Sequence, residues 1–468
     1  MPRARWLAAA VAVLALGYVA ADVEDAVPGA LTTDPASAGP APTRPTPSDP
    51  PRTPPTSALP ALSAQAPAPT SESVSRVLDP LLSVPALGPQ TSATVLDPVS
   101  GQVLLDRTGS IPRTPASTAK LLTAAAVLST VGGGTTLPTR VVQGATADEV
   151  VLVGSGDVML GTGRSVLDQV HGHAGLLTLA EQVAVKLRAE QRTKVAVRFD
   201  DSVFTGPSVS RAWAATDVPI GFVGPITALG LDRNLARLGH RSPADPSQSA
   251  ADAFAAALRA QGITVVGLVA RSRANAGSPV LGEVRSAPVG DVLGVALTTS
   301  NNTLAEVLAR LTAQAMKRPT TFEGSALAVM DQVQTLGVNI GDAHLSDGSG
   351  LGAGSEVPSR VLADVLGLAS QDSTPALRPM LAGLPVSGFN GTLSDRFTTP
   401  PTHAAAGVVR AKTGTLTGVN SLAGTTVDAD GRLLVFVLMS DQVPVGGTTL
   451  ARRASDRVAA ALTACGCR

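Results

Sequence analysis

The tetrapeptide Ser117-Thr118-Ala119-Lys120 stands at the start of a helical pattern and is the first of three motifs that indicate the fold. Prolines 112 and 115 stop the preceding strand, and apolar residues then recur up to residue 131 at the spacing of a buried helix face. The i,i+3 spacing places the Ser117 hydroxyl and the Lys120 amine on one helix face, with the hydroxyl at the positive end of the helix dipole. Alone, Ser-x-x-Lys is more often a helix cap; here it also fits a serine nucleophile with its base.

Lysine is scarce in this chain, so each lysine that is present is a candidate for a role that arginine cannot fill. Only five of the 36 basic residues are lysines. Arginine keeps its proton, whereas burial or a nearby cation turns lysine into a neutral amine that can accept a proton. A second lysine begins Lys412-Thr413-Gly414-Thr415 on a predicted strand. Alternation directs Lys412 and Gly414 to one side and Thr413 and Thr415 to the other, and the glycine would let a substrate backbone lie along the strand edge.

A third motif, Ser300-Asn301-Asn302, interrupts a long helical pattern over residues 290–316. A loop at this point would present the Ser300 hydroxyl for proton relay and the Asn302 side chain for holding an amide. Each motif is weak alone, but all three occur once, in the order and context expected of a Ser-x-x-Lys, Ser-x-Asn, Lys-Thr-Gly set. The combination predicts one active site built from three distant segments.

The composition excludes several classes of protein. The 468-residue chain balances 36 basic against 36 acidic residues, and its aromatic content is 2%. It therefore offers neither a basic surface for phosphate backbones nor rings for stacking bases, and no nucleic acid partner is expected. Cys465 and Cys467, the only cysteines, are too close in sequence to close a useful loop or form a four-ligand metal site. Whether they pair or stay free is left open.

The start of the chain predicts export. Arg3 and Arg5 precede an apolar run over residues 7–20, which is typical of a secretory signal. The run is about 14 residues long, short of the ~20 that span a bilayer comfortably, so cleavage after Ala21 is favoured and membrane anchoring by residues 7–20 is the alternative. Thirteen prolines over residues 28–69 predict an extended spacer. We expect the protein in the cell envelope, the periplasm or the extracellular space.

The predicted elements run in the order β-hairpin, helix, mixed region, helices, β-meander, helix. This order indicates an α/β (α+β) fold with an inserted α/β region. The predicted division is residues 1–24 as signal peptide or N-terminal anchor, 25–73 as a disordered linker, 74–139 with 287–468 as the main domain, and 140–286 as an inserted accessory region.

With these motifs the sequence resembles the penicillin-binding proteins and serine β-lactamases, and more narrowly the class C low-molecular-mass penicillin-binding proteins, the D-alanyl-D-alanine carboxypeptidase/endopeptidase family. Three features carry the narrower resemblance: about 180 residues between Ser117 and Ser300, the turn Gly154-Ser155-Gly156-Asp157, and the loop Ser346-Asp347-Gly348-Ser349-Gly350-Leu351. The resemblance covers about residues 75–463. It implies a β-lactamase/transpeptidase-like domain, with an antiparallel sheet flanked by helices, that carries an inserted α/β region.

The resemblance implies a serine-type D-Ala-D-Ala carboxypeptidase, with endopeptidase activity as an addition, that acts on peptidoglycan stem peptides and is acylated by β-lactams. Lys120 would take the proton of Ser117, and Ser300 would pass a proton to the leaving amine. Lys412, kept charged, would bind the terminal carboxylate with Thr413 or Thr415. The backbone N–H groups of Ser117 and Thr415 would form the oxyanion hole.

Some residues carry weaker implications. Some family members hold the free end of a diamino acid with an aspartate that lies after a tryptophan, and Asp217 follows Trp213 in a similar place. Some members also have Leu-Ser-Arg where this chain has Leu351-Gly352-Ala353, so an arginine contact from that loop is missing. No cofactor or metal is expected, because His171 and His173 lie in a glycine-rich loop without a third ligand in view.

Two alternatives stay open at this point. A β-lactamase would hydrolyse its acyl-enzyme quickly, but the large insertion argues against it. A non-catalytic cell-envelope binding protein would keep the cleft as scaffold, but the intact motifs argue against that.

Overall fold

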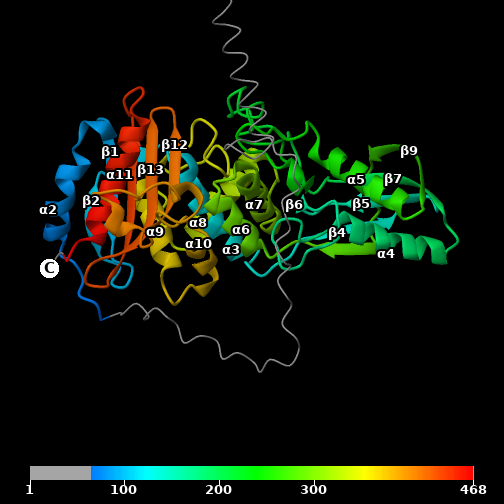
Figure 1. Ribbon diagram of the computed structural model, residues 1–468, viewed down its shortest axis with the longest axis horizontal. Coiled ribbons are helices and arrows are strands. Elements are labelled where there is room, and N and C mark those ends of the chain that lie inside the picture. Colours follow the sequence, from blue (N-terminus) through cyan, green and yellow to red (C-terminus); the bar gives the residue numbers. More distant parts are fainter. Residues whose placement is uncertain (1–64, 467–468) are drawn as a thin grey trace, which may run out of the picture. The chain divides into compact units, whose positions relative to one another are not determined.

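The computed structural model describes residues 65–466, so the predicted signal, most of the linker and Cys467 lie outside the described residues. Both ends of this part build one antiparallel five-stranded sheet of order β12-β13-β14-β1-β2 (Figure 1). Its strands are β1 (Gln90–Leu96), β2 (Val103–Arg107), β12 (Arg410–Leu416), β13 (Val419–Val427) and β14 (Leu433–Asp441). The predicted hairpin and meander are confirmed, and β1 joins them by pairing with β14.

Both faces of this sheet are buried, as the alternation along β14 shows. Leu434, Phe436 and Leu438 face one core, which they share with α2 (Ser71–Leu82) and α11 (Thr448–Thr463). Val435 and Val437 face the opposite core, to which α9 (Ser359–Ala369) contributes. Since side chains alternate along a strand, a strand covered on both faces consists almost entirely of apolar residues.

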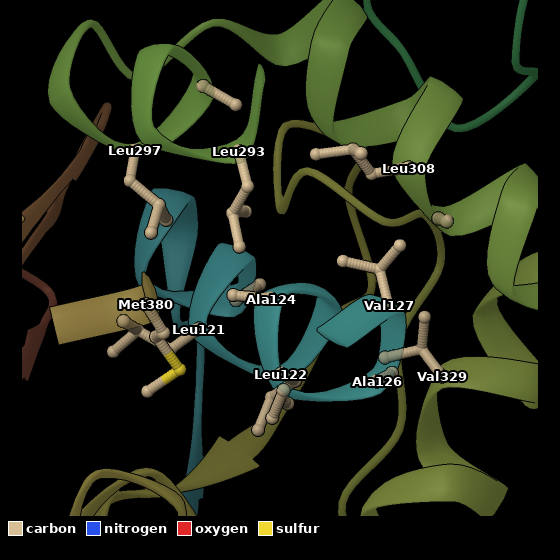
Figure 2. Packing of buried hydrophobic residues seen from close by; sticks show 14 of the residues in the cluster. Leu121, Leu122, Ala124, Ala126, Val127, Leu293, Leu297, Leu308, Val329 and Met380 are labelled. Carbon is tan, nitrogen blue, oxygen red and sulfur yellow. The ribbon is translucent and has the colours of Figure 1, made fainter. Parts of the chain in front are cut away.

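The second core surrounds α3 (Lys120–Thr130), the helix predicted after Pro115. It packs among α6 (Val289–Thr298), α7 (Asn302–Ala315), α8 (Phe322–Thr335) and α10 (Arg378–Ala382). Figure 2 shows Leu121 and Ala124 of α3 surrounded by side chains of these neighbours, such as Leu293 and Met380. All of α3 from Lys120 to Leu128 is buried, so this packing fixes the backbone that carries Lys120.

A second five-stranded sheet, of order β10-β4-β5-β7-β9, begins at Pro138, just before the region predicted as an insertion, and otherwise lies within it. It consists of β4 (Pro138–Gln143), β5 (Glu149–Val153), β7 (Lys194–Asp200), β9 (Thr264–Arg271) and β10 (Val280–Arg285), and it shares a core with α4 (Leu176–Ala189) and α5 (Pro246–Ala260). Strands β5, β7 and β9 are parallel, whereas β4 pairs antiparallel with both β5 and β10. We propose residues 140–286 as the accessory domain on this basis.

Four short strands pair outside the two large sheets: β3 (Pro112–Arg113) with β11 (Val357–Pro358), and β6 (Asp157–Leu160) with β8 (Leu229–Leu231). Helix α2 was not predicted from the sequence, because it follows the proline-rich stretch and contains Pro80. Its amphipathic face is buried against the first sheet, and Thr70 caps its first turn. Across residues 65–466, no helix is both long and apolar enough to cross a bilayer.

Candidate active site

Ser117 lies in a 3-10 turn (Ala116–Ala119) immediately before α3 rather than in the α-helix itself. The preceding residue, Ala116, has a φ of 47°, in the left-handed region that residues with a side chain rarely adopt. The Pro115 carbonyl accepts hydrogen bonds from the Thr118 hydroxyl at 2.6 Å and the Ser421 hydroxyl at 2.7 Å. These bonds hold the strained turn, and such strain is characteristic of functional sites.

Lys120 is buried, with 1% of its surface exposed, and its Nζ atom contacts its own turn, the second motif and the loop that contains Ser349. It lies 2.9 Å from Ser117 Oγ, 2.6 Å from Asn302 Oδ1 and 2.8 Å from the Ser349 carbonyl oxygen. Burial lowers the pKa of Lys120 to about 8, against the opposing influence of the Asp347 and Glu306 carboxyl groups. At that pKa roughly a tenth of the molecules carry a neutral amine at pH 7, compared with roughly one in three thousand for an unperturbed lysine.

Asp347 shapes the loop that supplies the third of these contacts. Its fully buried carboxylate accepts hydrogen bonds from the indole of Trp213 at 2.8 Å and from three backbone N–H groups, those of Ser349, Gly350 and Gly352. Gly350 has a φ of 75°, and a Cβ there would lie 2.0 Å from the Ala116 carbonyl oxygen. In the sequence this loop served only as a family marker; nothing in its residues showed that it places a carbonyl on Lys120.

Ser300 and Asn302 lie where the helical pattern was predicted to break. Helix α6 ends at Thr298, Asn301 caps α7 by accepting from the Leu304 N–H, and Asn302 begins α7. Ser300 has a φ of 57°, the second left-handed non-glycine residue of the site. Besides its contact with Lys120, Asn302 donates through Nδ2 to the Phe222 carbonyl at 2.8 Å, which ties the motif to the inserted region.

Lys412 is fully buried on β12, and its Nζ atom donates to Ser300 Oγ and to the Thr413 carbonyl, both at 2.8 Å. Burial, followed by the nearby charge of Lys120, lowers the pKa of Lys412 well below its usual value. Both influences oppose a positive charge on Lys412, whose charged state in the reaction stays a prediction.

Gly414 has a steric role that the sequence did not reveal, while its predicted role beside the substrate stays a prediction. A Cβ on Gly414 would lie 2.0 Å from Ser421 Oγ and 2.7 Å from the Pro115 carbonyl oxygen. The glycine therefore makes room for the turn that carries Ser117, on the buried side of β12. Its neighbours Thr413 and Thr415 are half-buried on the other side of the strand, as alternation predicts.

A cavity of about 950 Å³ opens beside these groups. Its lining includes Ser117, Ser300, Thr413 and Thr415, together with Thr392, residues 395–402 and five residues of α11, which are Thr449, Arg452, Arg453, Asp456 and Arg457. Asp217 is not part of this lining. It is 7% exposed, and its carboxylate accepts the Ala214 N–H at 2.8 Å, so its role in substrate binding stays a prediction.

The two histidines of the insertion have local partners. His171 Nδ1 lies 2.7 Å from Asp232 Oδ1, and His173 Nδ1 lies 2.9 Å from the Gln169 carbonyl oxygen. In the part of the chain that the structure describes, no three His, Cys, Asp or Glu side chains are grouped so as to hold a metal ion.

The sequence matches a known protein family and several characterised relatives. Residues 74–240 and 236–463 match the family described as D-Ala-D-Ala carboxypeptidase 3 (S13). The chain is 36% identical over 427 residues to carboxypeptidase DacB of Mycolicibacterium smegmatis, covering 89% of this chain and 90% of the relative. It is 35% identical over 403 residues to carboxypeptidase Rv3627c of Mycobacterium tuberculosis, covering 85% of each chain.

Among solved structures, penicillin binding protein 4 (dacB) of Haemophilus influenzae has the same fold, with a TM-score of 0.67 at 22% identity over 82% of this chain and 97% of that one. The same H. influenzae protein has also been crystallised in complex with a β-lactam.

Proposed function

Because the chain belongs to the D-Ala-D-Ala carboxypeptidase 3 (S13) family, we propose that Ser117 is the nucleophile with which it cleaves D-Ala-D-Ala ends of peptidoglycan stem peptides. The chain is a serine-type D-Ala-D-Ala carboxypeptidase, as the resemblance of its motifs implied. The observation that carries the residue assignment is the contact of 2.9 Å between Ser117 Oγ and the buried Nζ of Lys120.

Acylation begins with proton transfer from the Ser117 hydroxyl to the neutral amine of Lys120. The Ser117 oxygen then attacks the carbonyl carbon of the penultimate D-alanine, and the backbone N–H groups of Ser117 and Thr415 stabilise the oxyanion. Ser300 gives its proton to the leaving amine, and Lys412, 2.8 Å from Ser300 Oγ, replaces that proton. The carbon–nitrogen bond breaks and D-alanine leaves. Water then attacks the ester carbon and gives its proton through Ser300 to Lys412, while Lys120 returns its proton to the departing Ser117 oxygen.

Substrate binding changes the charge of Lys412. The terminal carboxylate of the peptide, held by Thr413 or Thr415, brings a negative charge to the strand on which Lys412 lies. A nearby anion raises the pKa of a buried lysine and so favours its protonated form. Lys412 therefore becomes the charged partner of the carboxylate when substrate is present, while Asn302 and the Ser349 carbonyl hold Lys120 on Ser117.

The proposal extends to inhibitors and location. A β-lactam presents a strained amide and a carboxylate to the same groups, so it would acylate Ser117 and block the site, as its complex with the H. influenzae relative suggests. Because peptidoglycan lies outside the cytoplasm, the signal-like residues 7–20 would serve export or anchoring. The same acyl-enzyme would serve an endopeptidase reaction, for which the cavity of about 950 Å³ leaves space for a leaving group larger than D-alanine.

Labelling with a fluorescent penicillin, followed by peptide mapping, tests this assignment. The label is expected on Ser117, and both labelling and D-alanine release from a D-Ala-D-Ala tripeptide should disappear in Ser117→Ala and Lys120→Arg. Lys194→Arg is the matched control, because Lys194 is exposed on β7 in the inserted region. Label on another residue, or full activity in Ser117→Ala, would disprove the assignment.

A further inference from the structure

One wall of the cavity beside Ser117 carries arginines that the mechanism does not use. Arg452, Arg453 and Arg457, all on α11, line the same cavity as Ser117 and Thr415. One of them contacts strand β12: Arg452 donates through Nη2 to Thr415 Oγ1 at 3.4 Å. The Arg452 side chain is exposed, and this bond uses one of the five N–H donors of its guanidinium.

These arginines carry more positive charge than the protein neutralises. The cavity lining holds four arginines against two aspartates. One arginine and one aspartate, Arg396 and Asp456, form a nearly buried ion pair with each other at 2.5 Å. Within residues 65–466, Arg452, Arg453 and Arg457 form no ion pair. The cavity therefore has an excess of cations beside the strand that carries Thr415.

Intrahelical contacts of α11 do not balance these cations. Asp456 lies at i,i+4 from Arg452, but its carboxylate forms the ion pair with Arg396. Arg453 and Arg457 are a like-charged i,i+4 pair. The excess of positive charge beside β12 points to an anion supplied from outside the chain.

We propose that Arg452 is a specificity-determining residue that binds, together with Thr415, the carboxylate of the leaving group. This inference rests on the proposed function, which places that carboxylate at Thr413 or Thr415. The planar guanidinium donates in a fork that matches a carboxylate, and its contact with the Thr415 hydroxyl orients the fork toward the strand.

The test compares two reactive thioesters that differ by one charge. N-benzoyl-D-alanyl thioglycolate releases a leaving group with a carboxylate, and its methyl ester releases a neutral one. We expect Arg452→Gln to lower kcat/KM for the acid roughly 10- to 100-fold, the effect of losing a hydrogen bond to a charged group, and to change that for the ester less than about twofold. Arg452→Lys, which keeps the charge without the fork, should fall between.

Arg453→Gln is the matched control, because it removes the same charge from the same helix and the same cavity wall. It should change kcat/KM for either substrate by less than about threefold, as expected for an exposed charge without a fixed partner. Equal losses on acid and ester in Arg452→Gln, no loss on the acid, or an equally large loss in Arg453→Gln would each overturn the proposal.

The outcome is separable from the proposed function. If Arg452→Gln still hydrolyses the ester and is labelled at Ser117, its catalytic groups are intact. A loss of kcat/KM for the acid in this variant then reports on carboxylate binding alone. Hydrolysis of either thioester by Ser117→Ala would instead contradict the assignment of the nucleophile.

Discussion

Replacing Gly414 by alanine should slow the reaction by displacing the turn that carries Ser117. The new Cβ would lie 2.0 Å from Ser421 Oγ, 2.7 Å from the Pro115 carbonyl oxygen and 3.2 Å from Ala116 Cβ. It would therefore enter the hydrogen bond of 2.7 Å between the Ser421 hydroxyl and that carbonyl. The serine can rotate away, but the Pro115 carbonyl is backbone and has to move together with the turn that carries Ser117.

The size of the effect follows from these distances. Relieving the contact at Pro115 moves the turn by roughly 0.5 to 1 Å, and a misplacement of about 1 Å at a reacting group costs on the order of 100-fold in rate. We expect the rate of Ser117 acylation in Gly414→Ala to fall roughly 10- to 100-fold. Overpacking should also lower the free energy of unfolding by about 1–3 kcal/mol.

Two variants separate displacement from other causes. Ser421→Ala removes the hydrogen bond to Pro115 without adding bulk, so it should slow acylation less than Gly414→Ala does. Gly134→Ala adds a methyl group with no atom within 4 Å and should change nothing. Acylation is followed by fluorescent penicillin under stopped flow, and folding by thermal denaturation. A folded Gly414→Ala protein that acylates within about threefold of wild type would refute the steric argument.

Three further predictions concern the buried charges. Since only neutral Lys120 accepts a proton and its pKa is about 8, acylation should fall about tenfold per pH unit below about pH 8; a flat profile from about pH 6 to 8 would contradict this. Asp347→Ala leaves three backbone N–H groups without their carboxylate, so the free energy of unfolding, measured in urea, should fall by roughly 3 kcal/mol or more and acylation should slow. Trp213→Phe removes one hydrogen bond to that carboxylate and should lower the free energy of unfolding by about 1–3 kcal/mol. Arg432→Ala strands the fully buried Asp97 carboxylate, 2.7 Å from Arg432 Nη2, and should lower the free energy of unfolding by about 3–5 kcal/mol; a loss below about 1 kcal/mol would exclude a role of this pair in stability.

Local chain geometry explains what could be predicted from the sequence. The contact between Ser117 and Lys120 spans three residues, and helical periodicity alone is sufficient to place both groups on one side. The break before Asn302 and the two-sided alternation of β12 are likewise local, and the structure has both. Helix α2 was not predicted, because Pro80 argues against a helix in this segment. The helix is stabilised by the packing of its apolar face on the sheet, which cannot be deduced from the local sequence.

The tertiary structure alone decided how the site works. Lys120 meets Asn302 and the Ser349 carbonyl across 182 and 229 residues of chain, Gly414 makes room for a turn far away in sequence, and Arg452 reaches Thr415 from the last helix. The protonation of the two lysines also depends on how deeply packing buries them and on the distance between their charges. Spacing along a chain determines contacts within a few residues, whereas desolvation and long-range contacts arise only when separate segments pack together.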